Sequence, residues 1–318
     1  MQIGYKLATE AFDPKEIIRQ ALAAEEAGFD FVEMSDHYHP WLESQGHSAF
    51  TWDLLSYIAA KTSTIGLVTG VTCPSFRYHP AIVAQAAATL AIISDGRFTL
   101  GVGAGERLNE HVIGEDWPGV QKRHDRLTDA LHIINRLWQG GYQTYEGKYL
   151  RVEDARVWDL PETLPNIAVA SSGKKSAEIA AALGSGIFGT EPKVEMIKYW
   201  KEKGGSGPAY GEVPLAWAPN EDTAAQAVLE KSRWAVTGWK VMSELPNPVN
   251  FAGATTTVRP EDIKEQFACG PNVDRHVEVA KQFADAGFDH LVLMNAGPDP
   301  DGFMQFFKEE LGPKLRSI

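Results

Sequence analysis

Short apolar runs alternate with amphipathic, helix-like segments along most of the chain. The run at residues 64–71 shows little polar alternation, which indicates a strand buried on both faces. The predicted strands are residues 2–6, 29–34, 64–71, 97–103, 164–170, 186–189, 214–218 and 289–294. Helices are predicted between them, at residues 14–27, 49–62, 79–93, 127–138 and 174–183, and after the last strand at 302–311. Asp13, Pro14 and Gly28 are the N-cap, first-turn and C-cap residues that the first of these helices needs.

Eight strands separated by helical sequence predict a parallel (β/α)8 TIM barrel with insertions. An open, doubly wound sheet is the alternative. Residues 231–264 interrupt the rhythm with Trp234, Trp239 and several prolines, and we interpret them as an insertion that forms part of a lid or an oligomer contact. No linker of flexible composition divides residues 1–318, so a single domain is expected.

Composition and charge narrow the choice of partners. The chain has 318 residues, of which 44% are apolar and 23% are charged, and its formal net charge is −12. This acidic balance argues against a nucleic-acid partner, because phosphate binding needs a basic surface. No run is long enough for a membrane span or a signal peptide, and the two cysteines, Cys73 and Cys269, are far apart. A cytoplasmic protein with reduced thiols is the simplest expectation.

The segment from Ser35 to Trp41 follows a predicted strand and brings together an acid, an imidazole and an indole. Ligands of α/β folds bind at this edge, outside the carboxyl ends of the strands. Asp36 is suited to orient a ligand, His37 to move a proton near neutral pH, and Trp41 to form a flat wall. The alternative is a loop of mixed residues that only covers the sheet.

A second loop follows the strand at 97–103. Gly103 and Gly105 allow the backbone to approach a flat ligand, while Glu106 could hold a proton and Asn109 could donate a hydrogen bond. The glycine spacing is not that of the dinucleotide fingerprint. A tight turn with a solvated Glu is the alternative, although two such loops would converge in a barrel mouth.

Further candidates follow other strands. Gly70-Val71 permits a strained or bulged backbone, and Arg77 with Tyr78 suits either a ligand anion or a structural ion pair. Residues 170–173 form an anion seat at a helix start, or an ordinary helix cap. Thr190 and Lys193 could meet a substrate anion or lie in a solvated loop. There is no convincing metal site, no GxSxG elbow and no P-loop.

Three motifs, at residues 35–41, 72–85 and 101–110, closely resemble those of the deazaflavin-dependent glucose-6-phosphate dehydrogenase group. That group belongs to the bacterial luciferase-like superfamily of β/α barrels, and the resemblance extends over nearly the whole chain. It implies coenzyme F420 as hydride acceptor, a small-molecule substrate and a homodimer.

The resemblance also implies roles for individual residues. His37 would be the general base on the substrate hydroxyl, Trp41 would position the substrate, and Glu106 would supply a proton to the cofactor, with Glu10 as a further acid. Asp36 would hold the deazaflavin ring region, and Gly70-Val71 would form a non-prolyl cis peptide behind the ring. The remaining cofactor-binding residues would be Cys73, Gly103, Gly105 and Asn109 at the ring, and Ala170, Ser171, Ser172 and Gly173 at the phosphate-bearing tail.

The substrate end departs from the family pattern. Thr190, Lys193 and Lys240 match its sugar-phosphate site, but Gln266 stands where the family has an Arg, and losing a bidentate phosphate ligand is not conservative. An unphosphorylated sugar, another sugar phosphate or a secondary alcohol therefore stays open as the substrate. Two other hypotheses are an FMN-dependent monooxygenase of the same superfamily and a non-catalytic binding barrel.

Overall fold

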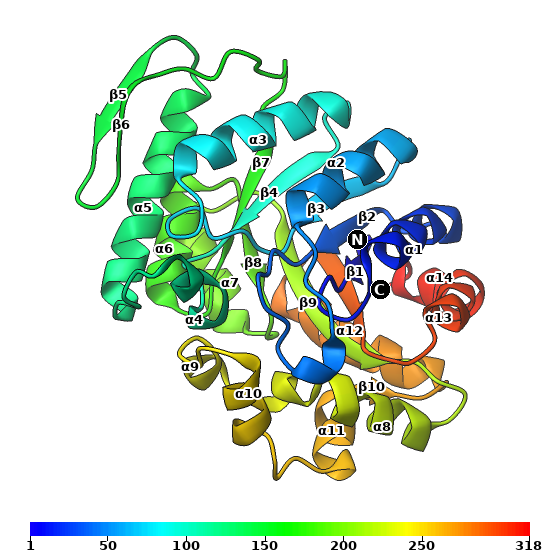
Figure 1. Cartoon of the computed structure of the whole chain (residues 1–318). Helices are drawn as coiled ribbons and strands as arrows, with labels where there is room; N and C mark the ends of the chain where they lie inside the picture. Colours follow the sequence, from blue (N-terminus) through cyan, green and yellow to red (C-terminus); the bar gives the residue numbers. More distant parts are fainter.

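The computed structural model of the chain describes residues 1–318, and its centre is a closed barrel of eight parallel strands (Figure 1). The strand order is β9-β11-β1-β2-β3-β4-β7-β8, and pairing of β8 with β9 closes the ring. The barrel strands are β1 (Gln2–Leu7), β2 (Phe31–Met34), β3 (Gly66–Thr69), β4 (Phe98–Val102), β7 (Asn166–Ala170), β8 (Gly186–Gly189), β9 (Ala209–Ala216) and β11 (His290–Asn295). The predicted (β/α)8 barrel is confirmed, and the open sheet is excluded because β8 pairs with β9 and closes the ring.

Helices cover the outside of the barrel and add to one of its ends (Figure 1). They are α1 (Pro14–Ala27), α2 (Thr51–Lys61), α3 (Pro80–Ile93), α4 (Arg107–Glu110), α5 (Val120–Leu137), α6 (Lys174–Leu183), α7 (Val194–Glu202), α8 (Glu221–Lys231), α9 (Trp239–Met242), α10 (Pro248–Ala254), α11 (Pro260–Gln266), α12 (Val273–Ala286), α13 (Pro300–Phe306) and α14 (Gly312–Leu315). No helix is long and apolar enough to cross a membrane.

Strand residues divide between two cores because successive side chains point to opposite faces. On β1, Ile3, Tyr5 and Leu7 belong to the large core between the barrel and its helices. Tyr5, for example, packs on Phe303 with the ring centroids 5.9 Å apart. A smaller apolar cluster of six buried residues includes Phe31 and Tyr210, which continue the layers inside the barrel. The position of Lys6 between Tyr5 and Leu7 therefore directs its side chain inward.

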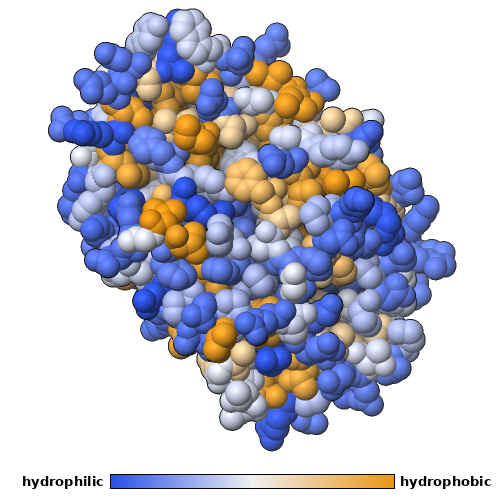
Figure 2. Space-filling view, viewed as in Figure 1, coloured by the Kyte–Doolittle hydropathy of each residue, from blue (hydrophilic) through white to orange (hydrophobic).

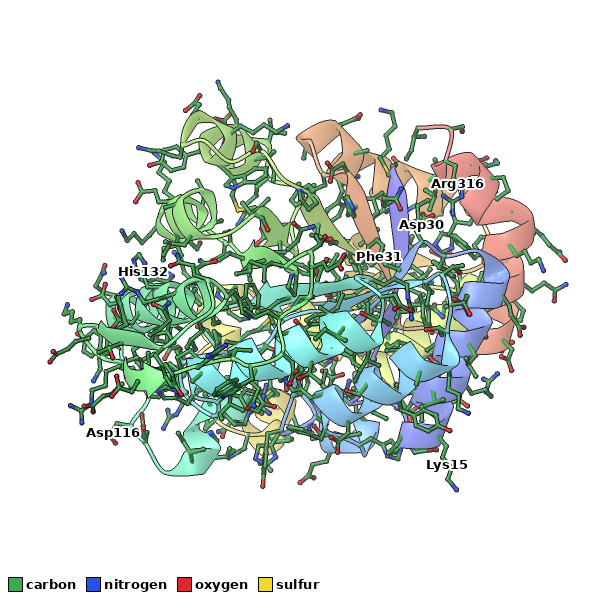
Figure 3. All side chains as sticks on the ribbon, turned by 90° about the horizontal axis from the view of Figure 1, so that it is seen from above. Lys15, Asp30, Phe31, Asp116, His132 and Arg316 are labelled. Atoms are coloured by element: carbon green, nitrogen blue, oxygen red, sulfur yellow. The ribbon has the colours of Figure 1, made fainter.

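Local signals decide the ends of several elements. The Asp13 carboxylate accepts hydrogen bonds from the backbone N–H groups of Lys15 and Glu16, and Gly28 ends α1 in the left-handed region at φ 88°. The C-terminal segment returns to the same place, where Arg316 donates to Asp30 Oδ2 at 3.0 Å (Figure 3). These contacts hold the start of β2, the strand that leads into the Asp36-His37 loop.

Most predicted boundaries differ from the structure by one or a few residues, and two predicted elements begin much too late. The strand expected at 214–218 is β9, which begins at Ala209. Its first half was not recognised because Glu212 interrupts the apolar pattern. The Glu212 side chain nevertheless points into the barrel, where it pairs with Lys6. The helix expected at 127–138 begins seven residues earlier, at Val120.

The sequence analysis also missed three strands. The antiparallel hairpin of β5 (Gln143–Glu146) and β6 (Arg151–Ala155) projects beside α5 and lies outside the barrel (Figure 1). A two-residue strand, β10 (Ala268–Cys269), extends the edge of β9.

The segment at 231–264 folds into short helices at one end of the barrel (Figure 1). It contains a 3₁₀ turn (Arg233–Val236), α9, α10 and the beginning of α11. Phe251 of α10 is fully buried, in a small apolar cluster with Trp41 and Leu42 from the loop after β2. The insertion therefore packs directly on the segment that carries the candidate acid and imidazole.

Candidate active site

A cavity of about 710 Å³ opens at the carboxyl ends of the barrel strands. Its walls come from the loops after β1, β2, β3, β4, β7 and β8, from the insertion and from the end of β11. Most of the predicted site residues line it: Glu10, Asp36, His37, Trp41, Gly70, Val71, Cys73, Gly103, Gly105, Glu106, Asn109, Ala170, Ser171, Ser172, Thr190 and Gln266. Residues from loops that are far apart in the sequence thus line one cavity.

Three predicted residues do not line this cavity. Lys193 faces a small neighbouring pocket, which it shares with Ser171, Ser172 and Thr190. Gly173, at the start of α6, and Lys240, on α9, are both exposed. The structure therefore brings Thr190 together with the Ser171-Ser172 turn, but leaves Lys240 away from it.

His37 lies between two carboxylates. Its Nδ1 is 3.1 Å from Glu10 Oε1, and its Nε2 is 3.0 Å from Glu106 Oε1. Burial lowers the pKa of the imidazole, but the charges of Glu10 and Glu106 raise it more, so that the pKa of His37 lies at about 9. The ring is therefore protonated at neutral pH in the free protein, and it forms a compact charged group at the cavity wall.

Neighbouring side chains fix both carboxylates. Asn109 Nδ2 donates to Glu106 Oε1 at 2.6 Å, while Asn109 Oδ1 accepts from the backbone N–H of Tyr38 at 2.8 Å. Ser35 Oγ donates to Glu10 Oε2 at 2.8 Å. Because Asn109 joins the loop after β4 to the loop after β2, it holds the Glu106 carboxylate in a fixed position relative to the His37 imidazole.

Asp36 is tied into the wall by four side-chain donors. Its Oδ1 accepts from Arg77 Nη2 at 3.1 Å and from Tyr78 Oη at 2.9 Å. Its Oδ2 accepts from Thr72 Oγ1 at 2.6 Å and from Trp52 Nε1 at 3.3 Å. Of the two interpretations of Arg77, the structure supports the structural ion pair.

Backbone of the loops after β3 and β4 forms another part of the cavity wall. The peptide bond between Gly70 and Val71 is cis, as the resemblance implies. A Cβ on Gly103 would lie 2.9 Å from Val71 Cγ2, and a Cβ on Gly105 would lie 2.7 Å from Cys73 Sγ. Side chains larger than hydrogen do not fit at these glycines, so the wall stays flat enough to receive the face of a planar ring.

Aromatic rings form the other side of the site. Trp41 lies 4.9 Å from the His37 ring, centroid to centroid, and Trp234 of the insertion stacks on Trp41 at 4.2 Å with an interplanar angle of 12°. Residues from Lys231 to Trp239, with the exception of Arg233, and Met242 also line the cavity. Between the two roles left open for the insertion, the structure supports a wall of the pocket.

Sequence reasoning missed several lining residues. Lys6 and Glu212 point from strand interiors into the base of the cavity, and Asn295 follows them at the end of β11. The signal for these residues is a charged residue at an inward-facing position of a strand. In the sequence alone, such a residue only interrupts an apolar run, so it was not recognised.

The fold and the acid–imidazole–acid group define the general class of the protein. It is a TIM-barrel protein with a candidate active site at the carboxyl ends of its strands. The sequence profile described as luciferase-like monooxygenase matches residues 1–237, and the chain belongs to this family. The resemblance found in the three motifs is thereby confirmed.

Relatives with named activities cover nearly the whole chain. An F420-dependent glucose-6-phosphate dehydrogenase of Microbacterium testaceum is 35% identical, over 99% of this chain and 98% of its own length. An F420-dependent hydroxymycolic acid dehydrogenase of Mycobacterium tuberculosis is 34% identical, over 99% of this chain and 88% of its own. Among solved structures, an F420-dependent secondary alcohol dehydrogenase in complex with an F420–acetone adduct superimposes with a TM-score of 0.92 at 28% identity, covering 99% of each chain.

Proposed function

We propose that the chain is an F420-dependent dehydrogenase that takes a hydride from a hydroxyl-bearing carbon. The carbon that the sequence analysis favours is C1 of a sugar or sugar phosphate. The observation that carries the proposal is His37, held within 3.1 Å of two carboxylates beside a flat backbone wall. The activities of the relatives at 34–35% identity agree with it.

The wall fits the cofactor implied by the relatives. Coenzyme F420, when bound, supplies a deazaflavin ring that accepts a hydride. Gly70, Val71 and Cys73 from one loop, with Gly103 and Gly105 from the next, would lie along the ring, and Asp36 would support that wall. Ala170, Ser171, Ser172 and Gly173 would hold the phosphate-bearing tail, since these small residues lead directly into α6, whose first N–H groups have no partner within the helix and favour an anion.

The acid–imidazole–acid group divides the proton chemistry. His37 would accept the proton of the substrate hydroxyl as the hydride leaves the carbon, and Glu106 would give a proton to the cofactor. Glu10 would hold Nδ1 and orient the ring. Because His37 Nε2 and Glu106 Oε1 are 3.0 Å apart, the proton that His37 takes from the substrate hydroxyl would pass to the Glu106 carboxylate, and from there to the cofactor, without passing through solvent.

The substrate end supports an unphosphorylated alcohol over a sugar phosphate. Lys193 is already paired with Glu191 at 2.9 Å, Lys240 is exposed, and Gln266 offers a neutral amide where a guanidinium would bind phosphate. Trp41, Trp234 and Met242 instead offer apolar surface around His37. Within the proposal we therefore favour a neutral sugar over a sugar phosphate, and a secondary alcohol is our second candidate for the substrate class.

A cofactor and substrate screen tests this proposal. The protein is mixed with F420 and, in separate reactions, with glucose, glucose 6-phosphate or 2-propanol, and the loss of the absorbance of oxidised F420 is followed. Reduction of F420 by at least one of these alcohols is expected. Oxygen-dependent turnover with FMN and no reduction of F420 would instead favour the monooxygenase hypothesis, and tight F420 binding without any turnover would favour the binding barrel.

We further propose a homodimer. Large apolar side chains are exposed on α2, α3 and the loop before α2, namely Phe50, Tyr57, Ile82, Ile92 and Ile93. Figure 2 shows apolar residues among polar ones on the face that carries these helices. Light scattering tests the proposal, since a dimer has twice the mass of the chain. A cytoplasmic location stays a prediction from the sequence.

A further inference from the structure

A second charged group lies inside the barrel, below the cavity wall. Lys6 Nζ on β1 is 3.1 Å from Glu33 Oε2 on β2 and 2.8 Å from Glu212 Oε2 on β9. The side chain of Glu33 is completely buried, and those of Lys6 and Glu212 are only 10% and 12% exposed. No step of the proposed reaction uses these three residues, which we call the floor triad.

The floor triad is joined to the site by position. Lys6 and Glu212 line the cavity, and Glu33 lies behind them against the cis peptide, where a Cβ on Gly70 would overlap its carboxylate. Lys6 and Glu33 are neighbours in register on adjacent strands, so the rigid barrel fixes their contact. The triad is therefore part of the support beneath the flat wall.

Charge balance in the floor triad requires a proton. One ammonium faces two carboxylates, and a net negative charge in a buried site is costly. Burial and the charge of Glu212 raise the pKa of Glu33, Lys6 opposes them, and the pKa of Glu33 lies at about 8. Glu33 therefore holds the proton at neutral pH and loses it in mildly alkaline solution.

The ionisable groups around the triad connect it to His37. Glu10, from the loop after β1, raises the proton affinity of both Lys6 and Glu33, and it is also the ion-pair partner of His37 Nδ1. The groups that face His37 are Glu10, Glu106 from the loop after β4, Lys6 from β1, and His39 from its own loop. Lys6 and Glu10 thus belong to the surroundings of both charged groups.

We propose that Lys6, Glu33 and Glu212 form a second proton-holding site in the floor of the cavity, and that its charge controls how readily His37 gives up its proton. These are positioning residues, because they act on the reaction only through His37. When Glu33 releases its proton to solvent, the floor triad gains one negative charge, which favours the protonated imidazole. When the floor triad is neutral, the imidazole loses its proton more easily.

Glu33→Gln and Glu212→Gln test the proposal, because each removes one carboxylate and leaves Lys6 paired with the other. The histidine ring nitrogens are followed by NMR against pH in the protein without ligands, and the His37 signal is assigned by its loss in His37→Gln. The pKa of His37 is expected to fall by about one unit in either variant, because one negative charge in the same buried surroundings no longer favours the protonated imidazole.

Glu25→Gln is the matched control. The Glu25 carboxylate accepts hydrogen bonds from the backbone N–H groups of Ser63, Thr64 and Ile65, just before β3. Its loss therefore also costs stability, but at the amino ends of the barrel strands, whereas His37 follows a carboxyl end. Its His37 titration is expected to match that of the wild type. An unchanged or increased His37 pKa in both floor variants would overturn the proposal, and Glu212→Gln keeps the test open if Glu33→Gln does not fold. The measurement needs neither cofactor nor substrate, so its outcome is independent of the proposed activity.

Discussion

At the scale of single residues, the proposed chemistry depends on the protonation state of the His37 imidazole. His37 is 3.0–3.1 Å from two carboxylates, and their charges outweigh burial to place its pKa at about 9. A general base must be neutral before it accepts a proton. The same contacts that orient the ring therefore also hold back its reactivity at neutral pH.

The pH dependence of kcat/KM follows from this. As pH rises through about 9, the neutral fraction of His37 in the free enzyme increases, so kcat/KM is expected to rise tenfold per pH unit below pH 9 and then level off. Glu10→Gln removes one of the two charges and is expected to move the rising limb to lower pH. Initial rates across pH 6–10 measure both, and an unmoved limb in Glu10→Gln would contradict the assignment.

Removal of the imidazole separates binding from catalysis. His37→Ala is expected to lower kcat by about 10²–10⁴-fold, the usual contribution of a positioned acid–base group. Affinity for F420 is expected to stay close to that of the wild type, because other residues, Gly70, Val71, Cys73, Gly103 and Gly105, form the wall proposed to receive its ring. Loss of F420 binding in this variant, measured by fluorescence titration, would make His37 a cofactor ligand and not the base.

The proposed substrate preference rests on Gln266 and on the pairing of Lys193 with Glu191. A double variant, Gln266→Arg with Glu191→Gln, restores a guanidinium and frees the ammonium. It is expected to raise the ratio of kcat/KM for glucose 6-phosphate to kcat/KM for glucose by at least about tenfold, which is the effect of one additional charge-assisted hydrogen bond. Gln266→Lys is the control, because it adds a positive charge without the planar, bidentate guanidinium of Arg. An unchanged ratio would show that other residues set the preference.

At the scale of elements, the insertion is the part of the site that the sequence left undecided. Its Trp234 stacks on Trp41 at 4.2 Å, and Trp41 in turn faces His37. Trp234→Ala is expected to raise KM for the alcohol severalfold and to leave F420 affinity unchanged, while Trp234→Phe keeps the stack and most of the affinity. Equal losses for both ligands would show that the insertion supports the barrel mouth as a whole.

Local signals made much of the fold predictable. The Asp13 cap and the left-handed Gly28 are decided by a few neighbouring residues, and both were predicted. The loops after β2 and β4 also carried recognisable side chains, so His37 and Glu106 were predicted as candidates, and both line the cavity. Glu212 and Lys6 were missed because their pairing joins strands 206 residues apart, which no local pattern reveals. Trp234 was noticed, but its contact with Trp41 depends on how the insertion packs.

At the scale of the whole molecule, two buried groups hold protons that the unfolded chain would release. The folded pKa values of His37 and Glu33 lie at about 9 and 8, above their ordinary values of 6.5 and 4.5. A raised folded pKa adds stability below the unfolded pKa, and this contribution is lost as pH rises through the folded value. Both groups therefore make the protein less stable toward alkaline pH.

Denaturant unfolding measures that effect. The free energy of unfolding is expected to fall between pH 6.5 and pH 9, with His37 alone contributing roughly 3 kcal/mol at the full shift. His37→Gln is expected to flatten the decline. A stability that stays level or rises over this range in the wild type would mean that the two groups do not hold their protons in the folded protein.

Hydride transfer itself is the most direct test of the central claim. The protein is incubated with oxidised F420 and an alcohol that carries deuterium on the hydroxyl-bearing carbon, and the reduced cofactor is analysed by mass spectrometry. The account predicts one deuterium in each molecule of reduced F420, formed in the absence of oxygen. Reduced F420 without deuterium, or oxidation of the alcohol that requires FMN and oxygen, would contradict it.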